Sequence, residues 1–197
     1  MKTYRFLSTA IALLLAVSPV WAKDNTKDPK NPTPAEKRAQ LKSDVAAAID
    51  RYKKTDPGMD RFFTQSAGYV MFPNIDKAGF IVGGGHGAGE VYEHGKLIGT
   101  ATVTMGTVGL QAGAQTFSQV IFFKDAAALD RFKQNKFEWT ANASAVAAKA
   151  GASTNADYRS GVAVFTRADE GVMAEAAVGS QKFKYTPEAA AASAKKK

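Results

Sequence analysis

The sequence contains no cysteine among its 197 residues. This absence excludes a disulfide-stabilised scaffold, a metal site built on thiolates, a cysteine nucleophile and a lipid anchor attached to cysteine. A globular chain near this length buries roughly 70% of the surface that its unfolded form exposes, so a hydrophobic core can stabilise it without cross-links. With 45% hydrophobic and 10% aromatic residues, the composition predicts a folded chain rather than a disordered one.

Histidine is also scarce, since only His86 and His94 are present. Glu90 and Glu93 lie between them, but this spacing alone does not make convergent, supported metal ligands. The glycine-rich segment 83–89 loosely fits a dinucleotide fingerprint, yet strand-like alternation follows it where that fingerprint needs a helix. No nucleophile-elbow motif is present. We therefore predict a non-enzymatic protein without a metal or cofactor; the alternative, a hydrolase, would require a cleft with a perturbed His86 or Glu90.

The first 22 residues have the three parts of a secretory signal. Lys2 and Arg5 precede an apolar run over residues 6–17, and Val20-Trp21-Ala22 supplies the small-x-small cleavage pattern. The run is shorter than the roughly 20 apolar residues of a membrane-spanning helix. We predict export, with a final location in the periplasm, peripherally on the envelope or outside the cell; the lack of free thiols agrees with an oxidising compartment.

A polar, proline-rich leader over residues 23–34 is predicted to be flexible. A helix is then predicted from Pro34 to about Lys54, because five apolar residues recur at spacings of three and four and form one stripe. Asp56-Pro57-Gly58 is predicted to end it, and residues 59–67 to form a short second helix. The stripe consists of Leu41, Val45, Ala48, Ile49 and Tyr52.

The centre of the chain has the pattern of an antiparallel sheet rich in glycine. Residues 69–75 predict a short strand ended by Pro73-Asn74, and residues 78–92 a strand that passes through the glycine segment. Residues 93–96 predict a turn, and the alternation from 100 to 105 a half-buried strand. Residues 108–123 continue as one curved strand or two bent ones. Glycine inside strands indicates bulges, strong coiling or the close approach of another backbone.

Helical and β patterns return toward the C-terminus. Asp125 is a suitable N-cap for a helix over 126–137, and the alanine-rich segment 140–150 predicts a second one. Residues 161–167 and 172–180 are predicted to pair as a final hairpin, after a loop over 151–157.

Segregated runs of helix and strand predict the α+β class. The expected architecture is a curved antiparallel sheet, open or barrel-like, flanked by the N-terminal amphipathic helix and the central helices. We expect one domain over residues 35–186, preceded by the signal (1–22) and leader (23–34) and followed by a basic, alanine-rich tail (187–197).

The formal net charge of +8 is concentrated at the two ends of the chain. Without the predicted signal, residues 23–54 carry nine Lys and Arg against five Asp and Glu, and residues 122–197 carry twelve against eight. Residues 55–121, the predicted sheet, carry three against five. The basic excess therefore predicts an anionic partner for the flanking segments rather than for the sheet.

The first helix has basic residues on both sides of its apolar stripe. Such a helix can lie on an anionic lipid surface, where each Lys or Arg adds up to ~1 kcal/mol. Alternatively, the stripe packs on the sheet and the basic residues only solubilise the surface. Nucleic acid is not expected as a partner, because the chain is predicted to be exported and has no basic motif interleaved with aromatics.

The centre of the chain resembles the SYLF domain family, a lipid-binding module. The matching segments occur in the family's order over about residues 40–185, and no SH3 or FYVE domain accompanies them. The chain is thus similar to the stand-alone bacterial form. The segments are AGYVMFPNI (67–75), KAGFIVGG (77–84), GAG (87–89), GLQAGAQ (109–115) and GVMAE (171–175).

The resemblance implies binding of phosphoinositides or other anionic phospholipids at a membrane surface. Actin binding, associated with yeast relatives, is not expected of an exported chain. The alternative is a structural or protein-interaction module of the bacterial envelope, with an envelope protein as its partner. The lipid-binding residues implied by the match to the family's basic segment, together with a neighbouring lysine, are Lys37, Arg38, Lys42, Arg51, Lys53, Lys54 and Lys77.

Overall fold

A computed structural model describes residues 31–79, 82–108, 113–135, 138–140, 145–168 and 179–188. The described residues from Thr33 onward belong to one compact unit. The predicted signal, nearly all of the leader and the tail beyond Glu188 lie outside the described residues, as does most of the strand predicted over 172–180.

Helix α1 spans Pro34–Thr55, so the prediction of a helix from Pro34 to about Lys54 is confirmed. Thr33 and Glu36 form a capping box that satisfies amides at the start of the helix, and Pro34 occupies the first turn, where no amide donor is needed. Asp56 adopts an extended conformation and ends the helix. Because these capping signals are local, both ends of the helix could be predicted from the sequence.

Asp56 also anchors the segments that follow. Its carboxylate accepts hydrogen bonds from the amides of Gly58 (3.1 Å) and Ser153 (2.7 Å). Burial would raise the pKa of this carboxyl group, but the hydrogen bonds from Ser153 and Gly58 outweigh it and hold the pKa below its usual value. The short helices Pro57–Met59 (η1) and Asp60–Gln65 (α2) come next, in place of the single helix predicted over 59–67.

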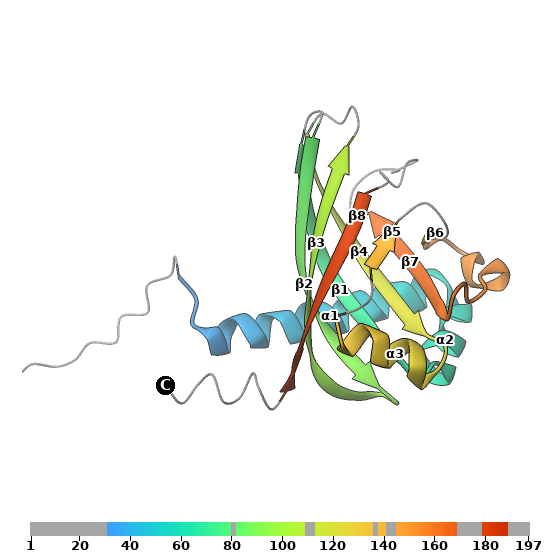
Figure 1. Cartoon of the computed structure of the whole chain (residues 1–197). Helices are drawn as coiled ribbons and strands as arrows, with labels where there is room; N and C mark the ends of the chain where they lie inside the picture. Colours follow the sequence, from blue (N-terminus) through green and yellow to red (C-terminus); the bar gives the residue numbers. More distant parts are fainter. Residues whose placement is uncertain are drawn as a thin grey trace, which may run out of the picture. The chain divides into compact units, whose positions relative to one another are not determined.

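Eight strands form one sheet in the order β5-β8-β3-β2-β1-β4-β7-β6 (Figure 1). All neighbouring pairs are antiparallel except β6 and β7. In the described residues the edge strands β5 and β6 do not pair, so the sheet is open, and the α+β prediction is confirmed. The strands are β1 (Gly68–Gly79), β2 (Val82–Glu93), β3 (Lys96–Val108), β4 (Gly113–Phe123), β5 (Glu138–Thr140), β6 (Ala145–Ala147), β7 (Val162–Ala168) and β8 (Gly179–Pro187).

Strand β1 is longer than the predicted strand over 69–75. Pro73-Asn74 does not end it, because the pairing with both neighbouring strands shifts register between Met71 and Ile75. Such a bulge accommodates a proline that cannot donate to the ladder. The turn predicted over 93–96 is confirmed: His94 (φ 47°) and Gly95 (φ 76°) are both left-handed, as a tight hairpin between twisted strands requires.

The C-terminal third contains one wrong prediction and one that the described residues do not test. Residues 145–147 form strand β6 rather than part of a helix over 140–150, because pairing with β7 overrides the helix preference of alanine. The hairpin predicted between 161–167 and 172–180 is not tested, since residues 169–178 lie outside the described residues; β7 pairs with β4, and β8, over Gly179–Pro187, pairs with β3. The helix predicted over 126–137 is present as α3 (Ala126–Lys133), with Asp125 as its cap, and a short helix, η2 (Ala152–Asn155), lies within the predicted loop.

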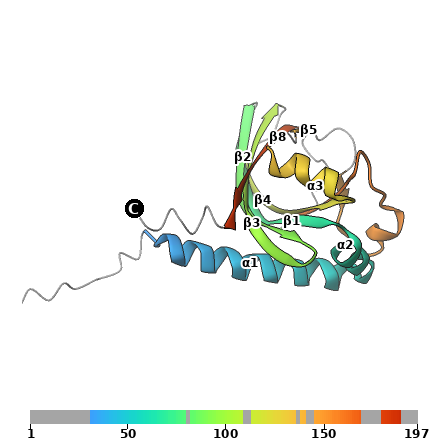
Figure 2. The ribbon, with the colours of Figure 1, turned by 60° about the horizontal axis from the view of Figure 1, so that its bottom comes forward.

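Each face of the sheet has a buried cluster under different helices (Figure 2), while the outer ends of the strands are exposed on one face, at Asp76, His86 and Thr104. We call one the α1 face, because Tyr69, Met71 and Phe122 pack there with residues of α1 and α2. The opposite α3 face carries Val70 and Phe72, which pack with residues of α3. Alternate residues of β1 therefore enter separate hydrophobic clusters, as the period of a strand requires.

Glycines line the α3 face of β2, where the sheet bends around α3. A Cβ at Gly89 would lie 2.4 Å from the carbonyl oxygen of Met71 and 2.8 Å from the Phe72 ring. At Gly87 it would lie 2.8 Å from both Asn74 O and Ile75 Cγ1. Because β1 approaches β2 this closely, there is no room for a side chain at Gly87 or Gly89. The glycine pattern is thus a requirement of the coiled sheet.

We expect Gly89→Ala to destabilise the fold by roughly 2 kcal/mol or more, because the added methyl group meets backbone that cannot move freely. Gly106→Ala is the matched control, since a Cβ at Gly106 has no atom within 4 Å. Urea unfolding of both variants tests this. Equal stabilities would show that space on the α3 face does not require glycine.

Candidate functional site

The six predicted cations of α1 differ in their exposure. Lys37, Lys42 and Lys54 are exposed, whereas Arg38, Arg51 and Lys53 are partly buried. Arg38 forms an ion pair with Glu188, next to the end of β8. Lys53 pairs with Asp60 at 2.8 Å and lies 5.2 Å from the centre of the Phe63 ring. The helix therefore presents fewer uncompensated charges to solvent than its sequence contains.

The apolar stripe of α1 packs against the sheet. Val45, Ala48 and Tyr52 are buried, and Leu41 and Ile49 pack against the same cluster. The Tyr52 hydroxyl lies 3.0 Å from the carbonyl oxygen of Ser118 on β4 and 3.2 Å from that of Phe165 on β7. Of the two roles considered for the stripe, packing on the sheet is the one found. This stripe is therefore not available to lipid while α1 remains in place.

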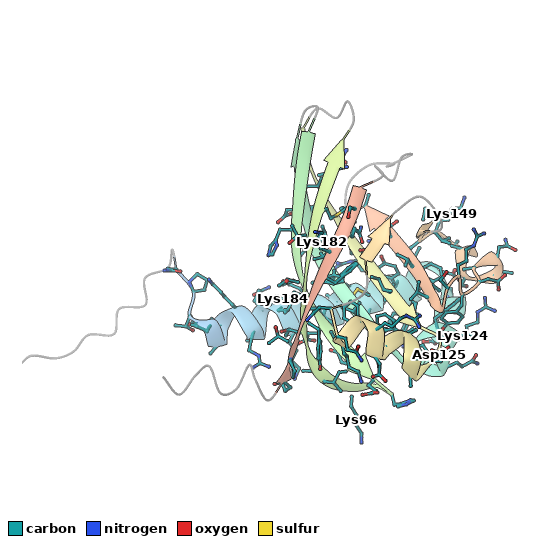
Figure 3. All side chains as sticks on the ribbon, in the orientation of Figure 1. Lys96, Lys124, Asp125, Lys149, Lys182 and Lys184 are labelled. Carbon is teal, nitrogen blue, oxygen red and sulfur yellow. The ribbon has the colours of Figure 1, made fainter. Side chains whose placement is uncertain are left out.

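Two exposed lysines on β8, Lys182 and Lys184, extend the basic surface (Figure 3). They alternate with Phe183, which lies in the core under α3, so their side chains are on the α1 face. These two lysines are absent from the predicted lipid-binding residues, because the last predicted strand ends at residue 180. The alternation Lys-Phe-Lys-Tyr over 182–185 is the sequence signal that identifies them.

Lys77 does not lie beside the basic helix. It follows Ile75 on the α3 face, and its Cβ and the Met105 sulfur each lie 3.5 Å from the Cβ that Gly85 lacks. The Lys77 residue is only 5% exposed, and burial lowers the pKa of its ammonium group. Among the described residues it has no ion-pair or hydrogen-bond partner. The structure thus separates Lys77 from the other six predicted residues.

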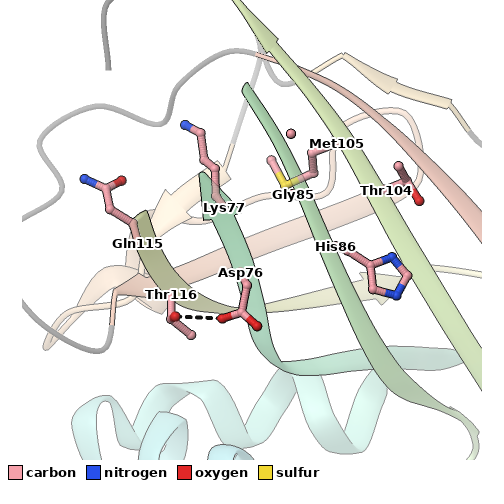
Figure 4. Close-up of a pocket in the computed structure, with 9 residues that line it drawn as sticks. Asp76, Lys77, Gly85, His86, Thr104, Met105, Gln115 and Thr116 are labelled. Atoms are coloured by element: carbon pink, nitrogen blue, oxygen red, sulfur yellow. Dashed lines mark hydrogen bonds between the residues drawn. The ribbon is translucent and has the colours of Figure 1, made fainter. Parts of the chain in front are cut away.

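A pocket of about 480 Å³ surrounds the outer ends of the central strands near Lys77 (Figure 4). Lys77, Gln115 and Met105 project to one side of the strands, and Asp76 and its neighbours to the other. On that second side Thr116 donates a 2.7 Å hydrogen bond to Asp76. The pocket is lined by Asp76, Lys77, Gly84, Gly85, His86, Thr104, Met105, Gln115 and Thr116.

The residues considered for hydrolysis do not form a site together. His86 is exposed on β2, whereas Glu90 is buried and accepts a 2.6 Å hydrogen bond from the Tyr92 hydroxyl. Burial, followed by this hydrogen bond and the charge of Glu90, raises the pKa of Tyr92. The part of the chain that the structure describes contains no group of three or more His, Cys, Asp or Glu side chains suited to a metal ion.

Comparison with known proteins identifies the class of this glycine-rich α+β domain. The family model described as "Ysc84: Las17-binding protein actin regulator" matches residues 104–192. Beta cell expansion factor A of Aeromonas veronii is 27% identical over 154 residues. That alignment covers 77% of this chain and 58% of the relative, so the chain spans less than two thirds of the relative's length.

The C-terminal part of the chain matches the Ysc84/SYLF family, in agreement with the resemblance seen in its sequence. Within the described residues, none of the helices is long and apolar enough to cross a lipid bilayer.

We expect Lys77→Met to be more stable than the wild type at pH 7, because it removes a buried charge that lacks a partner. The lowered folded-state pKa means that the unfolded chain holds this proton more tightly. The free energy of unfolding of the wild type should therefore rise relative to that of the variant as the pH increases toward 10.5, the ordinary pKa of lysine. Urea unfolding at several pH values measures the difference.

Lys182→Met is the matched control, since Lys182 is exposed on the other face of the sheet and should show a much smaller effect. If Lys77→Met were less stable than the wild type at every pH, and the difference in their free energies of unfolding did not change with pH, the assignment of a desolvated ammonium group would be wrong.

Proposed function

We propose that this protein is an exported, non-enzymatic module that binds anionic phospholipid at a membrane surface. Its match to the Ysc84/SYLF family supports this function, together with the lysines exposed on α1 and β8. The predicted signal sequence supports export. Actin regulation, which the family description names, is not extended to this chain, because the predicted signal removes it from the cytosol.

The basic surface that we assign to lipid consists of Lys37, Lys42, Lys182 and Lys184. The observation that carries the proposal is the ion pair between Arg38 and Glu188, which joins the N-terminal half of α1 to the end of β8. The ion pair holds the N-terminal half of α1 near the end of β8, and each of these two elements has exposed lysines. Neither element alone carries as many unpaired charges.

The binding that this surface supports is electrostatic and peripheral. The stripe of α1 is buried against the sheet, so the helix has no comparable apolar face to insert among acyl chains. A solvated lysine near an anionic surface contributes about 1 kcal/mol, and salt screens that attraction within a Debye length. The association should therefore require anionic headgroups and weaken at physiological salt.

We expect the triple variant Lys37→Gln, Lys42→Gln and Lys184→Gln to bind vesicles containing phosphatidylserine roughly 10- to 100-fold more weakly than the wild type at low salt. The substituted side chains are exposed, so the fold should be unaffected. Vesicle flotation over a series of salt concentrations measures the partition coefficients.

The control variant neutralises Lys96, Lys124 and Lys149, three exposed lysines elsewhere on the surface (Figure 3). It has the same net charge as the test variant and should retain most of the binding. Equal binding of the wild type to neutral and anionic vesicles would refute the proposal and favour a protein-interaction module of the envelope. Equal losses in the two variants would show that net charge, rather than this surface, drives association.

A further inference from the structure

The α3 face contains two buried polar side chains that the fold leaves incompletely bonded. Lys77 is 5% exposed and has no partner in the described residues. Gln181 on β8 is 3% exposed, and its Oε1 is buried without a hydrogen bond. Its amide nitrogen lies 3.7 Å from the sulfur of Met105, a weak acceptor. Buried polar groups are rarely left in this condition, so each calls for an explanation.

These two side chains belong to one row across the sheet. The strand register places Gln115 opposite Lys77, Lys77 opposite Gly85, Gly85 opposite Met105, and Met105 opposite Gln181. Directly opposed residues point to the same face, so the row forms a continuous strip on the α3 face. The strip is cationic at Lys77 and amide-bearing at Gln181, with a thioether between them.

Gly85 adds no side chain in the middle of this row. A Cβ there would lie 3.0 Å from the carbonyl oxygen of Asp76 and 3.5 Å from both the Lys77 Cβ and the Met105 sulfur, so the row is low at this position. The glycine is partly exposed, and with Lys77, Met105 and Gln115 it forms the α3 side of the pocket at the outer ends of these strands (Figure 4). Asp76, His86, Thr104 and Thr116 line the same pocket from the other side of the sheet.

The next row on the same face is entirely apolar. This row lies two residues away from the first along each strand. Its members, which are directly opposed in the strand register, are Phe117, Ile75, Gly87, Val103 and Phe183. Consecutive rows are about 6.6 Å apart, so an uncompensated cation lies close to aromatic and aliphatic side chains. A ligand that satisfies both rows must carry an anionic group beside a hydrocarbon segment.

We propose that this row on the α3 face is a binding site for a single-chain anionic amphiphile, with its carboxylate or phosphate on the Lys77 ammonium group and its alkyl chain over Gly85 and Met105. Methionine suits this role, because its flexible thioether adapts to chains of different shape. An anion beside Lys77 would also relieve the cost of burying that charge. The site is on the opposite face from the basic surface, so it does not depend on the proposed membrane binding.

The test compares three dodecyl ligands below their micelle concentrations, measured by calorimetry and by the shift in melting temperature of the full protein. We expect dodecanoate and dodecyl phosphate to bind the wild type at least roughly tenfold more tightly than dodecanol, because only the first two place a charge on Lys77. The comparison of the two anions distinguishes a fatty acid from a lipid phosphate. Inorganic phosphate, which has no alkyl chain, should bind far more weakly than dodecyl phosphate.

Lys77→Met should abolish the preference for the charged ligands, and Lys77→Arg should restore it. Lys96→Met is the matched control, since Lys96 is exposed at the start of β3, outside both the row and the basic surface, and should leave binding unchanged. Dodecanol binding as tightly as dodecanoate, or a Lys77→Met variant that keeps the preference, would overturn the proposal.

Vesicle flotation separates this proposal from the proposed function. Lys77→Met should bind anionic vesicles like the wild type, whereas the triple lysine variant of the basic surface should bind dodecanoate like the wild type. Loss of both activities in the Lys77→Met variant, with an intact melting transition, would contradict the assignment of two separate sites.

Discussion

The central constraint on this structure is that part of its sheet is apolar on both faces and must be covered on both. On one face, Tyr52 of α1 is buried among sheet residues, with its hydroxyl near carbonyl oxygens of two strands. On the other, Phe132 of α3 lies 5.0 Å from Phe123 and 5.7 Å from Phe183 between ring centres. The sheet coils around α3, and the glycines of β2 make that coiling possible. Each helix is therefore part of the core.

This constraint determines how the molecule can meet anions. Helix α1 uses its apolar stripe for folding, so exposed lysines on α1 and β8 are left for a headgroup surface. Those lysines are solvated, and their attraction is individually weak and sensitive to salt. Lys77 is different, since it is buried beside apolar side chains, where a single charge interacts more strongly. The two faces thus offer anion sites with different physical properties.

The sequence predicted the parts of the fold that depend on local signals. The capping box, the stripe and the Asp56-Pro57-Gly58 stop defined α1, and the His94-Gly95 turn defined the hairpin of β2 and β3. It did not predict that β7 and β8 join opposite halves of the sheet, because such pairing depends on contacts distant in sequence. Lys77 was expected beside the basic helix, on a segment after the predicted strand. In the structure β1 continues through a bulge: Tyr69 and Met71, before the bulge, face α1, whereas Ile75 and Lys77, after it, face α3.

The most direct test of this account asks whether α1 stays on the sheet when the protein binds a membrane. Because the chain has no cysteine, spin labels can be placed specifically at the exposed positions Ala47 on α1 and Lys124 after β4. Electron–electron double resonance then measures the distance between the labels with and without anionic vesicles. We predict the same narrow distribution in both states; a longer, broader distribution on vesicles would show that α1 leaves the sheet and would contradict the account.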